Sequence, residues 1–180
     1  DDLCGRRLFR EVAVCGCQPK EISRWLGCAS GGDGRPPLHG WVGLGEGKMK
    51  VLVLGGTQFN GYHLVKELVR CGHDVTILNR GKTQANLPRS VKRLVCDRTD
   101  HDGMRAVLAG HDWDCVHDMT AYQPADVELM TEILDGRTGH YVFASSTVIY
   151  AASNALPFTE SHPVDRSSEQ NQYGLNKLLC

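Results

Sequence analysis

From Met49 onward the sequence predicts an α/β fold with a doubly wound parallel β-sheet. Short apolar runs, typical of buried strands, alternate along the chain with segments whose apolar residues recur at helical spacing. A glycine-containing turn at residues 55–61 joins the first such strand to the first such helix. Alternating strands and helices are connected by right-handed crossovers, which place the strands parallel in one sheet with helices on both faces.

The first predicted strand, Lys50–Leu54, is followed by a helix with Leu64, Val65 and Leu68 on one face, which Gly72 ends. Four further strands are predicted at Val75–Leu78, Val91–Val95, Cys115–Met119 and Tyr141–Ala144. Two more helices, one around residues 104–108 and one that Pro124 opens, separate the last three of these strands. In such a sheet, ligands bind at the carboxyl ends of the strands.

Length and charge favour a single globular domain. The chain has 180 residues and a formal net charge of −1, without the basic block expected of a nucleic-acid-binding protein. The longest apolar runs, such as Val51–Leu54, are far below the roughly 20 residues that cross a bilayer. Asp1-Asp2 does not resemble the basic start of a signal peptide. We therefore expect a soluble, cytoplasmic protein with no membrane contact, and the charge balance disfavours nucleic acid as a partner.

The cysteine and histidine patterns predict no metal site. Eight cysteines show no repeated spacing, so reduced thiols are expected rather than a disulfide framework. The tight pair Cys15-Gly-Cys17 lacks the paired form typical of structural zinc, and the eight histidines show no ligand spacing.

The segment before Met49 differs in character from the rest. Residues 1–48 are rich in glycine and cysteine and have no sustained strand or helix period. A disordered extension, a transit peptide and upstream sequence foreign to the natural protein are the alternatives, and acidic residues fit a transit peptide badly. Because Met49-Lys50 directly precedes the first strand, we expect the domain to comprise residues 49–180. The chain stops three residues after Lys177, inside a predicted helix, so we expect this domain to be incomplete at its carboxyl end.

The turn Gly55-Gly56-Thr57-Gln58-Phe59-Asn60-Gly61 is typical of a Rossmann-type dinucleotide site. Such a turn needs glycine at a sharp bend, at the close approach to the pyrophosphate, and where the helix packs on the strand. Gly55 and Gly61 fill the outer two positions, whereas Gln58 departs from the pattern at the middle one. The residues expected to contact the cofactor here are Gly55, Gly56, Thr57, Gln58, Phe59 and Gly61. A tight turn without a ligand is the alternative.

The stretch from Val51 to Gly61 resembles the opening of extended short-chain dehydrogenases/reductases, the NAD-dependent epimerase/dehydratase family. The similarity covers about residues 49–180, and one branch of the family writes this turn as Gly-Gly-Thr-x-Phe-x-Gly. The resemblance implies that Asp97 lies near the adenine and that Asp118 to Tyr122 pass the nicotinamide ribose. For Asp97, an ordinary surface carboxylate is the alternative.

The sequence Tyr173-Gly174-Leu175-Asn176-Lys177 places a tyrosine and a lysine on one face of a helix. A phenol is a poor base at neutral pH, but a nearby ammonium favours the phenolate. The pair follows the fifth strand, as the catalytic pair does in the family. Tyr173 is therefore predicted to transfer the proton, and Lys177 to support it and to orient the cofactor ribose.

The end of the fifth strand resembles the family's active-site serine segment. Counting back from Tyr150 places the catalytic hydroxyl at Ser146, with its neighbour Ser145 as the main alternative. Such a hydroxyl can hydrogen-bond the substrate oxygen as charge develops; the alternative is a cluster that satisfies backbone groups. Dehydratases of the family carry Asp-Glu directly after it. Thr147-Val148 cannot transfer those protons, which disfavours dehydration.

The resemblance predicts an NAD(P)-dependent epimerase or reductase that acts on a nucleotide sugar, and it allows a homodimer of the full-length protein. Asn79-Arg80-Gly81-Lys82 follows the second strand where NAD-preferring domains place an acid, and Asp74 lies at the wrong end of that strand. Arg80 and Lys82 therefore favour NADP over NAD, with solvated loop charges as the alternative. Two other functions stay open. The turn also resembles that of chloroplast stem-loop-binding proteins, which bind RNA, and a cofactor-binding relative without turnover would keep the same residues.

Overall fold

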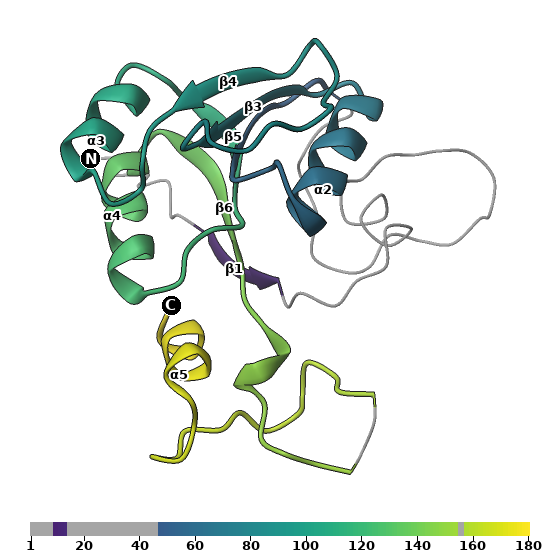
Figure 1. Cartoon of the computed structure of the whole chain (residues 1–180), viewed down its shortest axis with the longest axis vertical. Coiled ribbons are helices and arrows are strands. Elements are labelled where there is room, and N and C mark those ends of the chain that lie inside the picture. Colours follow the sequence, from purple (N-terminus) through teal and green to yellow (C-terminus); the bar gives the residue numbers. More distant parts are fainter. Residues whose placement is uncertain (1–8, 14–46, 155–156) are drawn as a thin grey trace, which may run out of the picture.

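The described residues of the computed structural model, 9–13, 47–154 and 157–180, form a parallel sheet with helices on both faces (Figure 1). The sheet has six strands in the order β1-β6-β5-β2-β3-β4, and all of its strand pairs are parallel. In chain order the strands are β1 Phe9–Ala13, β2 Lys50–Leu54, β3 Asp74–Asn79, β4 Lys92–Val95, β5 Trp113–Asp118 and β6 Thr138–Ala144.

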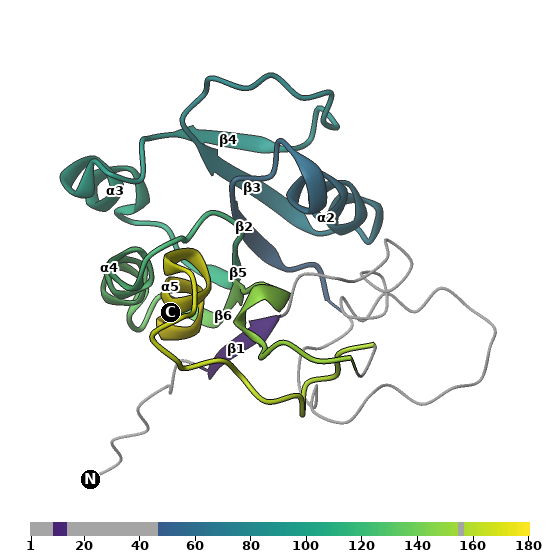
Figure 2. The ribbon, with the colours of Figure 1, turned by 60° about the horizontal axis from the view of Figure 1, so that its bottom comes forward.

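The helices lie in two layers, with α2 on one face of the sheet and α3, α4 and α5 on the other (Figure 2). They comprise α2 Phe59–Arg70, α3 His101–Leu108, α4 Pro124–Leu134 and α5 Gln172–Leu179, and a short 3-10 helix η1, Thr147–Ile149, follows β6. Each β–α connection is a crossover between parallel strands, as expected for a doubly wound sheet.

Alternate side chains of the strands form two apolar cores. On β2, Val51 and Val53 pack with α2, whereas Leu52 and Leu54 pack in the core that includes residues of α3 and α4. All four are at most 1% exposed. Burying such a side chain contributes about 1.5–3 kcal/mol, so a central strand that is apolar on both faces stabilises both layers.

The predicted fold class is confirmed, and the five predicted strands correspond to β2 through β6. The edge strand β1 was not expected, since residues 1–48 showed no strand period. It runs parallel to β6, with Phe9 opposite His140 and Ala13 opposite Ala144. Backbone hydrogen bonding at an open sheet edge needs no side-chain pattern, so no sequence pattern predicted this strand. The other expectations for residues 1–46 lie outside the described residues.

Two further observations bear on the expectations from composition. Cys96 carries a free thiol, but Cys71 is disulfide-bonded, so the expectation of reduced thiols is wrong for Cys71. None of the helices in the described part of the chain could span a lipid bilayer.

The order of the strands defines where a ligand can bind. The chain runs from β2 outward to β3 and β4, then returns to β5 on the other side of β2. Connections that leave neighbouring strands in opposite directions open a crevice at their carboxyl ends. The turn after β2 and the loop after β5 lie at this crevice, where Met119 N–H donates to the Leu54 carbonyl at 3.2 Å.

Candidate functional site

The glycine turn between β2 and α2 depends on glycine at three positions. Gly55 and Gly56 have φ of +100° and +82°, backbone angles that residues other than glycine rarely adopt. A Cβ on Gly56 would lie 2.9 Å from Ile77 Cγ2 and 3.0 Å from Val65 Cγ2. A Cβ on Gly61 would lie 3.1 Å from the backbone nitrogen of Gly56, so the helix approaches the turn closely. The structure thus places Gly55 and Gly61 in the outer positions predicted for them.

The N-terminus of α2 lacks the side-chain cap that α3 and α5 have. Asp100 and Asn171 accept backbone N–H groups at the starts of α3 and α5, from Gly103 at 3.0 Å and Gly174 at 2.8 Å. Gln58, the N-cap residue of α2, makes no side-chain capping bond, and the first turn of α2 contains no acidic residue. An uncapped helix start is a favourable place for a phosphate, because its N–H groups and the helix dipole attract anions.

Gln58 and Phe59 are the N-cap and the first residue of α2, and both side chains are exposed. Phe59 is 87% exposed and has φ of +45°, the one such value among non-glycine residues in the part of the chain that the structure describes. Backbone strain of this kind costs of order 1–3 kcal/mol and is often found at ligand sites. The sequence could not predict this strained backbone at Phe59, because residue type does not determine φ.

Arg80 and Asp97, both predicted to meet the cofactor, lie near each other after β3 and β4, and Arg80 and Lys82 are exposed. Hydrogen bonds from the Thr99 backbone N–H and hydroxyl lower the pKa of the Asp97 carboxyl, and the charges of Arg80 and Lys82 lower it further. Asp74, by contrast, lies at the amino end of β3 and pairs with Lys92 at 2.9 Å. β3 therefore ends on Asn79, and its acidic residue lies at the opposite end.

Asn79 ends β3 and connects it to the glycine turn. Its side-chain nitrogen donates to the Gly55 carbonyl at 3.4 Å, and its side-chain oxygen accepts the Gly81 N–H at 2.9 Å. The amide thereby joins the turn that is expected to meet the pyrophosphate to the loop that carries Arg80.

Lys177 is buried beneath the carboxyl ends of β5 and β6. It is 5% exposed, and its ammonium donates to the carbonyls of Ala121 at 2.7 Å and Ala144 at 2.8 Å. The same Nζ lies 5.8 Å from the centre of the Tyr173 ring and 5.1 Å from that of Tyr122. Tyr173 is 44% exposed, so its ring can meet a ligand while Lys177 lies behind it.

Ser146 and Ser145 have different surroundings. Ser146 is half-buried at the start of η1, where its Oγ accepts the Val148 N–H at 3.4 Å. Ser145 is 3% exposed, and within the part of the chain that the structure describes its Oγ has no hydrogen-bond partner. Because η1 packs against α5, the structure brings Ser146 near the helix that carries Tyr173. The assignment of the catalytic hydroxyl to Ser146 stays a prediction.

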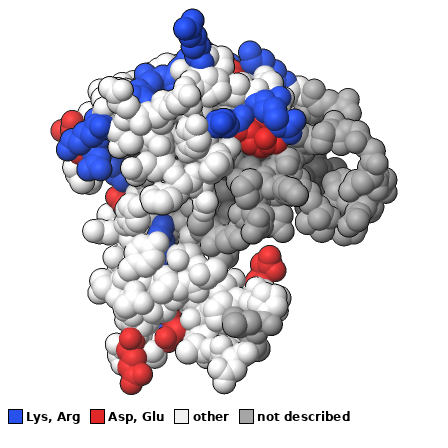
Figure 3. Space-filling view, turned by 45° about the vertical axis from the view of Figure 1, so that its right-hand side comes forward, with Lys and Arg blue, Asp and Glu red and all other residues white. Residues whose placement is uncertain are grey.

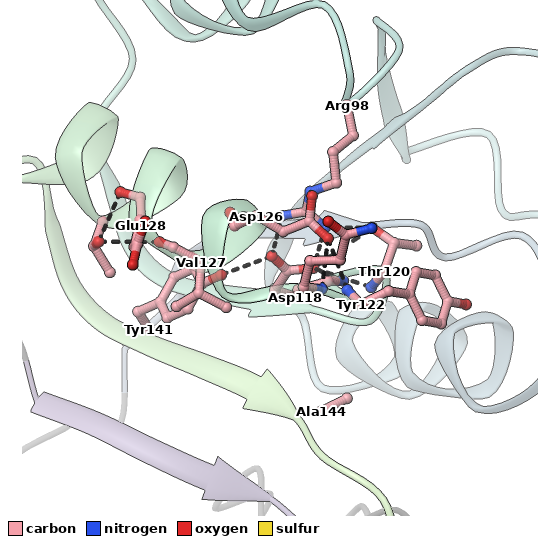
Figure 4. Close-up of polar contacts among 12 residues, drawn as sticks. Arg98, Asp118, Thr120, Tyr122, Asp126, Val127, Glu128, Tyr141 and Ala144 are labelled. Atoms are coloured by element: carbon pink, nitrogen blue, oxygen red, sulfur yellow. Dashed lines mark hydrogen bonds and ion pairs between the residues drawn. The ribbon is translucent and has the colours of Figure 1, made fainter. Parts of the chain in front are cut away.

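A buried ionic cluster adjoins these residues (Figure 4). Asp118, at the end of β5, is fully buried and receives two hydrogen bonds from the Arg98 guanidinium, and the Tyr141 hydroxyl donates to it at 2.6 Å. Burial alone would raise the pKa of the Asp118 carboxyl, but Arg98 outweighs burial and the pKa is lowered. Burial and the Asp118 charge both raise the pKa of Tyr141, so that its hydroxyl stays a donor.

Reasoning from the sequence missed Arg98 and the hydroxyl of Tyr141. Arg98 follows directly after Asp97, yet a charge in a loop gives no sign that it will be buried. Tyr141 was read as an apolar strand residue, and only its partner shows the use of its hydroxyl. Asp118 and Tyr122 were placed near the nicotinamide ribose by the resemblance, and both lie next to Lys177's acceptor, Ala121. Within the described ranges no group of three or more His, Cys, Asp or Glu side chains could hold a metal ion.

Residues 51–180 match the family model described as "NAD dependent epimerase/dehydratase family". Three curated proteins are similar to the chain. The chloroplast stem-loop binding protein of 41 kDa b of Arabidopsis thaliana is 32% identical over 132 residues, 66% of this chain and 35% of that protein. The 2'-dehydrokanamycin reductase of Streptomyces kanamyceticus is 30% identical, over 74% and 37%. The UDP-glucose 4-epimerase of Lactobacillus helveticus is 30% identical, over 73% and 44%.

The fold is also that of solved epimerases. The UDP-glucose 4-epimerase from Bifidobacterium longum, solved in complex with NAD+ and UDP, superposes with a TM-score of 0.59 at 23% identity, over 72% of this chain and 46% of that one. The chain thus spans less than half the length of the proteins it matches.

Proposed function

The chain belongs to the NAD-dependent epimerase/dehydratase family, and on that premise we propose that it is the cofactor-binding part of an enzyme that epimerises or reduces a nucleotide sugar. Relatives named as an epimerase and as a reductase support an enzyme of this kind. A single observation carries the proposal: a buried ammonium, Lys177, lies behind a solvent-accessible phenol, Tyr173, and donates to the Ala121 carbonyl in the loop that follows β5.

The residues at the crevice fit a nicotinamide dinucleotide. The uncapped start of α2 and its glycine turn would hold the pyrophosphate. Asp97 would lie near the adenosine, and Lys177 near the nicotinamide ribose. When bound, the nicotinamide accepts or returns a hydride, which is the chemistry that no side chain can supply.

The three catalytic side chains have separate tasks in this proposal. Tyr173 removes the proton from the substrate hydroxyl as the hydride leaves its carbon, and returns it when the carbonyl is reduced. Lys177 supports the charge on the phenol oxygen through its fixed ammonium. Ser146 donates a hydrogen bond to the substrate oxygen. Thr147 and Val148, the first two residues of η1, offer no acid or base for loss of water, so dehydration is disfavoured.

The loop after β3 leads us to propose that NADP is preferred over NAD. A carboxylate at the end of this strand would bind the ribose 2′-hydroxyl and repel a 2′-phosphate, and Asn79 stands there instead. Arg80 and Lys82 add positive potential beside it. The cytoplasmic location expected from the sequence, and the homodimer that the resemblance allows, also stay predictions.

RNA binding is a second candidate function, and the distribution of charge favours it. Nine Lys or Arg but two Asp or Glu lie in residues 47–95, whereas residues 96–180 hold five and thirteen. On the face in Figure 3 the basic side chains gather over the upper part of the molecule, which carries β3, β4 and α2. The near-zero net charge conceals this separation. A relative named as a stem-loop binding protein also supports RNA binding.

Two binding measurements on the 180-residue chain separate these functions. We expect NADPH fluorescence to report one saturable site, and RNA retention to be weak and lost between low and moderate salt as for nonspecific phosphate contacts. Retention of a stem-loop RNA without any nicotinamide site would overturn the proposal. Exposed Arg89→Ala serves as a control that lowers charge away from the predicted cofactor residues.

A further inference from the structure

The loop between β5 and α4 is held by two carboxylates (Figure 4). The backbone N–H groups of residues 120 to 123 are consecutive, and each of them donates to a side chain. Oδ1 of Asp118 accepts the first two, each at 3.0 Å, and Oδ2 of Asp126 accepts the last two, at 2.8 and 3.0 Å. Four amides fixed in succession leave this loop little freedom to move.

Arg98 joins the two carboxylates. Its Nη1 donates to Asp118 Oδ1 at 2.8 Å and to the Thr120 hydroxyl at 3.0 Å, and its Nη2 donates to the other oxygen of Asp118. Its Nε lies 3.6 Å from Asp126 Oδ1. The side chain of Arg98 is 13% exposed and that of Asp118 is fully buried. A buried charge pair of this kind is a poor source of stability, since desolvation offsets much of the attraction, but it fixes geometry where each member is hydrogen-bonded.

The fixed loop presents a carbonyl to Lys177. Asp118 accepts the N–H of Ala121, and the carbonyl of Ala121 accepts the Lys177 ammonium at 2.7 Å. Ala121 is fully buried and Lys177 is 5% exposed. A shift of the loop would therefore move one of the two backbone acceptors that place this ammonium.

We propose that Arg98 and Asp118 are positioning residues for Lys177, acting through the backbone of residues 120–121. The inference rests on the proposed function, because it concerns the lysine that would meet the cofactor ribose. Asp118 is sealed from solvent and cannot touch a ligand itself. A pair that only stabilises the fold would affect cofactor binding whether or not Lys177 were present, whereas a positioning pair acts only through it.

A double-mutant cycle on the 180-residue chain separates these two roles. The variants are Asp118→Asn, Lys177→Met and the two combined, with NADPH affinity measured by fluorescence titration. We expect each single change to weaken NADPH binding about tenfold, which lies within the range of coupling between residues of one network. The double variant should bind NADPH no more weakly than Lys177→Met. Glu132→Gln is the matched control: it weakens the exposed Arg105–Glu132 pair, which links α3 to α4 and also has two hydrogen bonds, and should leave affinity unchanged.

Amide hydrogen exchange reports the loop itself. In Asp118→Asn, exchange at residues 120 and 121 should accelerate, while residues 122 and 123, which Asp126 holds, should change less. Tyr141→Phe covers the case in which Asp118→Asn fails to fold: it deletes one hydrogen bond to Asp118 and no charge. It should weaken binding by a few fold, again only when Lys177 is present.

Failure of the positioning role and failure of the proposed function give different results. Equal loss of affinity in the presence and absence of Lys177 would show a structural role and overturn the inference, as would unchanged affinity in folded Asp118→Asn and Tyr141→Phe. Wild-type protein that binds no nicotinamide dinucleotide would instead overturn the proposed function, and the positioning role with it.

Discussion

Replacement of Gly56 by alanine tests how tightly the turn after β2 is packed. Gly56 and Gly72 have nearly the same backbone angle, φ of +82° and +86°. A Cβ on Gly72 would have nothing within 4 Å, whereas a Cβ on Gly56 would lie within 3.0 Å of side chains on β3 and α2. The pair therefore separates backbone strain from steric overlap.

The expected loss of stability follows from these two terms. A left-handed backbone angle costs an alanine about 1–2 kcal/mol, and this is the whole effect expected for Gly72→Ala. Overpacking adds about 1–3 kcal/mol at Gly56, for a total of about 2–5 kcal/mol. Urea unfolding of the two variants measures the difference in the free energy of unfolding. Gly56→Ala costing no more than Gly72→Ala would refute the close packing of the turn.

Three further predictions concern the cofactor, the pH dependence and the catalytic phenol. Arg80→Ala should weaken NADPH binding about tenfold and leave NADH binding unchanged, because a charge-assisted bond to the 2′-phosphate is lost; equal loss for both would count against an NADP preference. Burial first, and then the charge of His140, lowers the pKa of His117 to about 4. The folded state thus holds His117 neutral, and stability should fall by up to about 1.4 kcal/mol per pH unit as pH drops from about 6.5 to 4. Urea midpoints across that range should show the slope in wild type and a flatter one in His117→Gln; equal slopes would contradict the assignment. Tyr173→Phe should abolish turnover of a nucleotide sugar by the protein that carries this chain while NADPH affinity stays within about twofold, because only the titrating oxygen is removed; retained turnover would move the proton transfer elsewhere.

The sequence was sufficient to predict strands β2 to β6, because their signal is local. Lys50–Leu54 was predicted with the bounds that β2 has, and Pro124 begins α4 as expected. The ends of the other elements differ by a few residues, since propensity does not define where hydrogen bonding stops.

The placement of the candidate residues was predictable where it depends on spacing, as at Gly55, Gly61, Tyr173 and Lys177. It was not predictable where it depends on what a side chain meets across the sheet. Arg98 and Tyr141 both converge on Asp118 from sequence separations of 20 or more, and no local pattern marks such a meeting. The sharp charge contrast between residues 47–95 and 96–180 was readable from the sequence, but the net charge concealed it.

The most direct test of the account maps where NADP+ binds, using backbone amide NMR shifts of the 180-residue chain. We predict shifts at the carboxyl ends of the strands, at residues 55–61, at Arg80 and Asp97, and at residues 145–147. The turns at Gly110 and Gly136, which precede β5 and β6 at the opposite edge, should stay unchanged. Shifts confined to that opposite edge, or none at saturating NADP+ and NAD+, would contradict a dinucleotide site at the glycine turn.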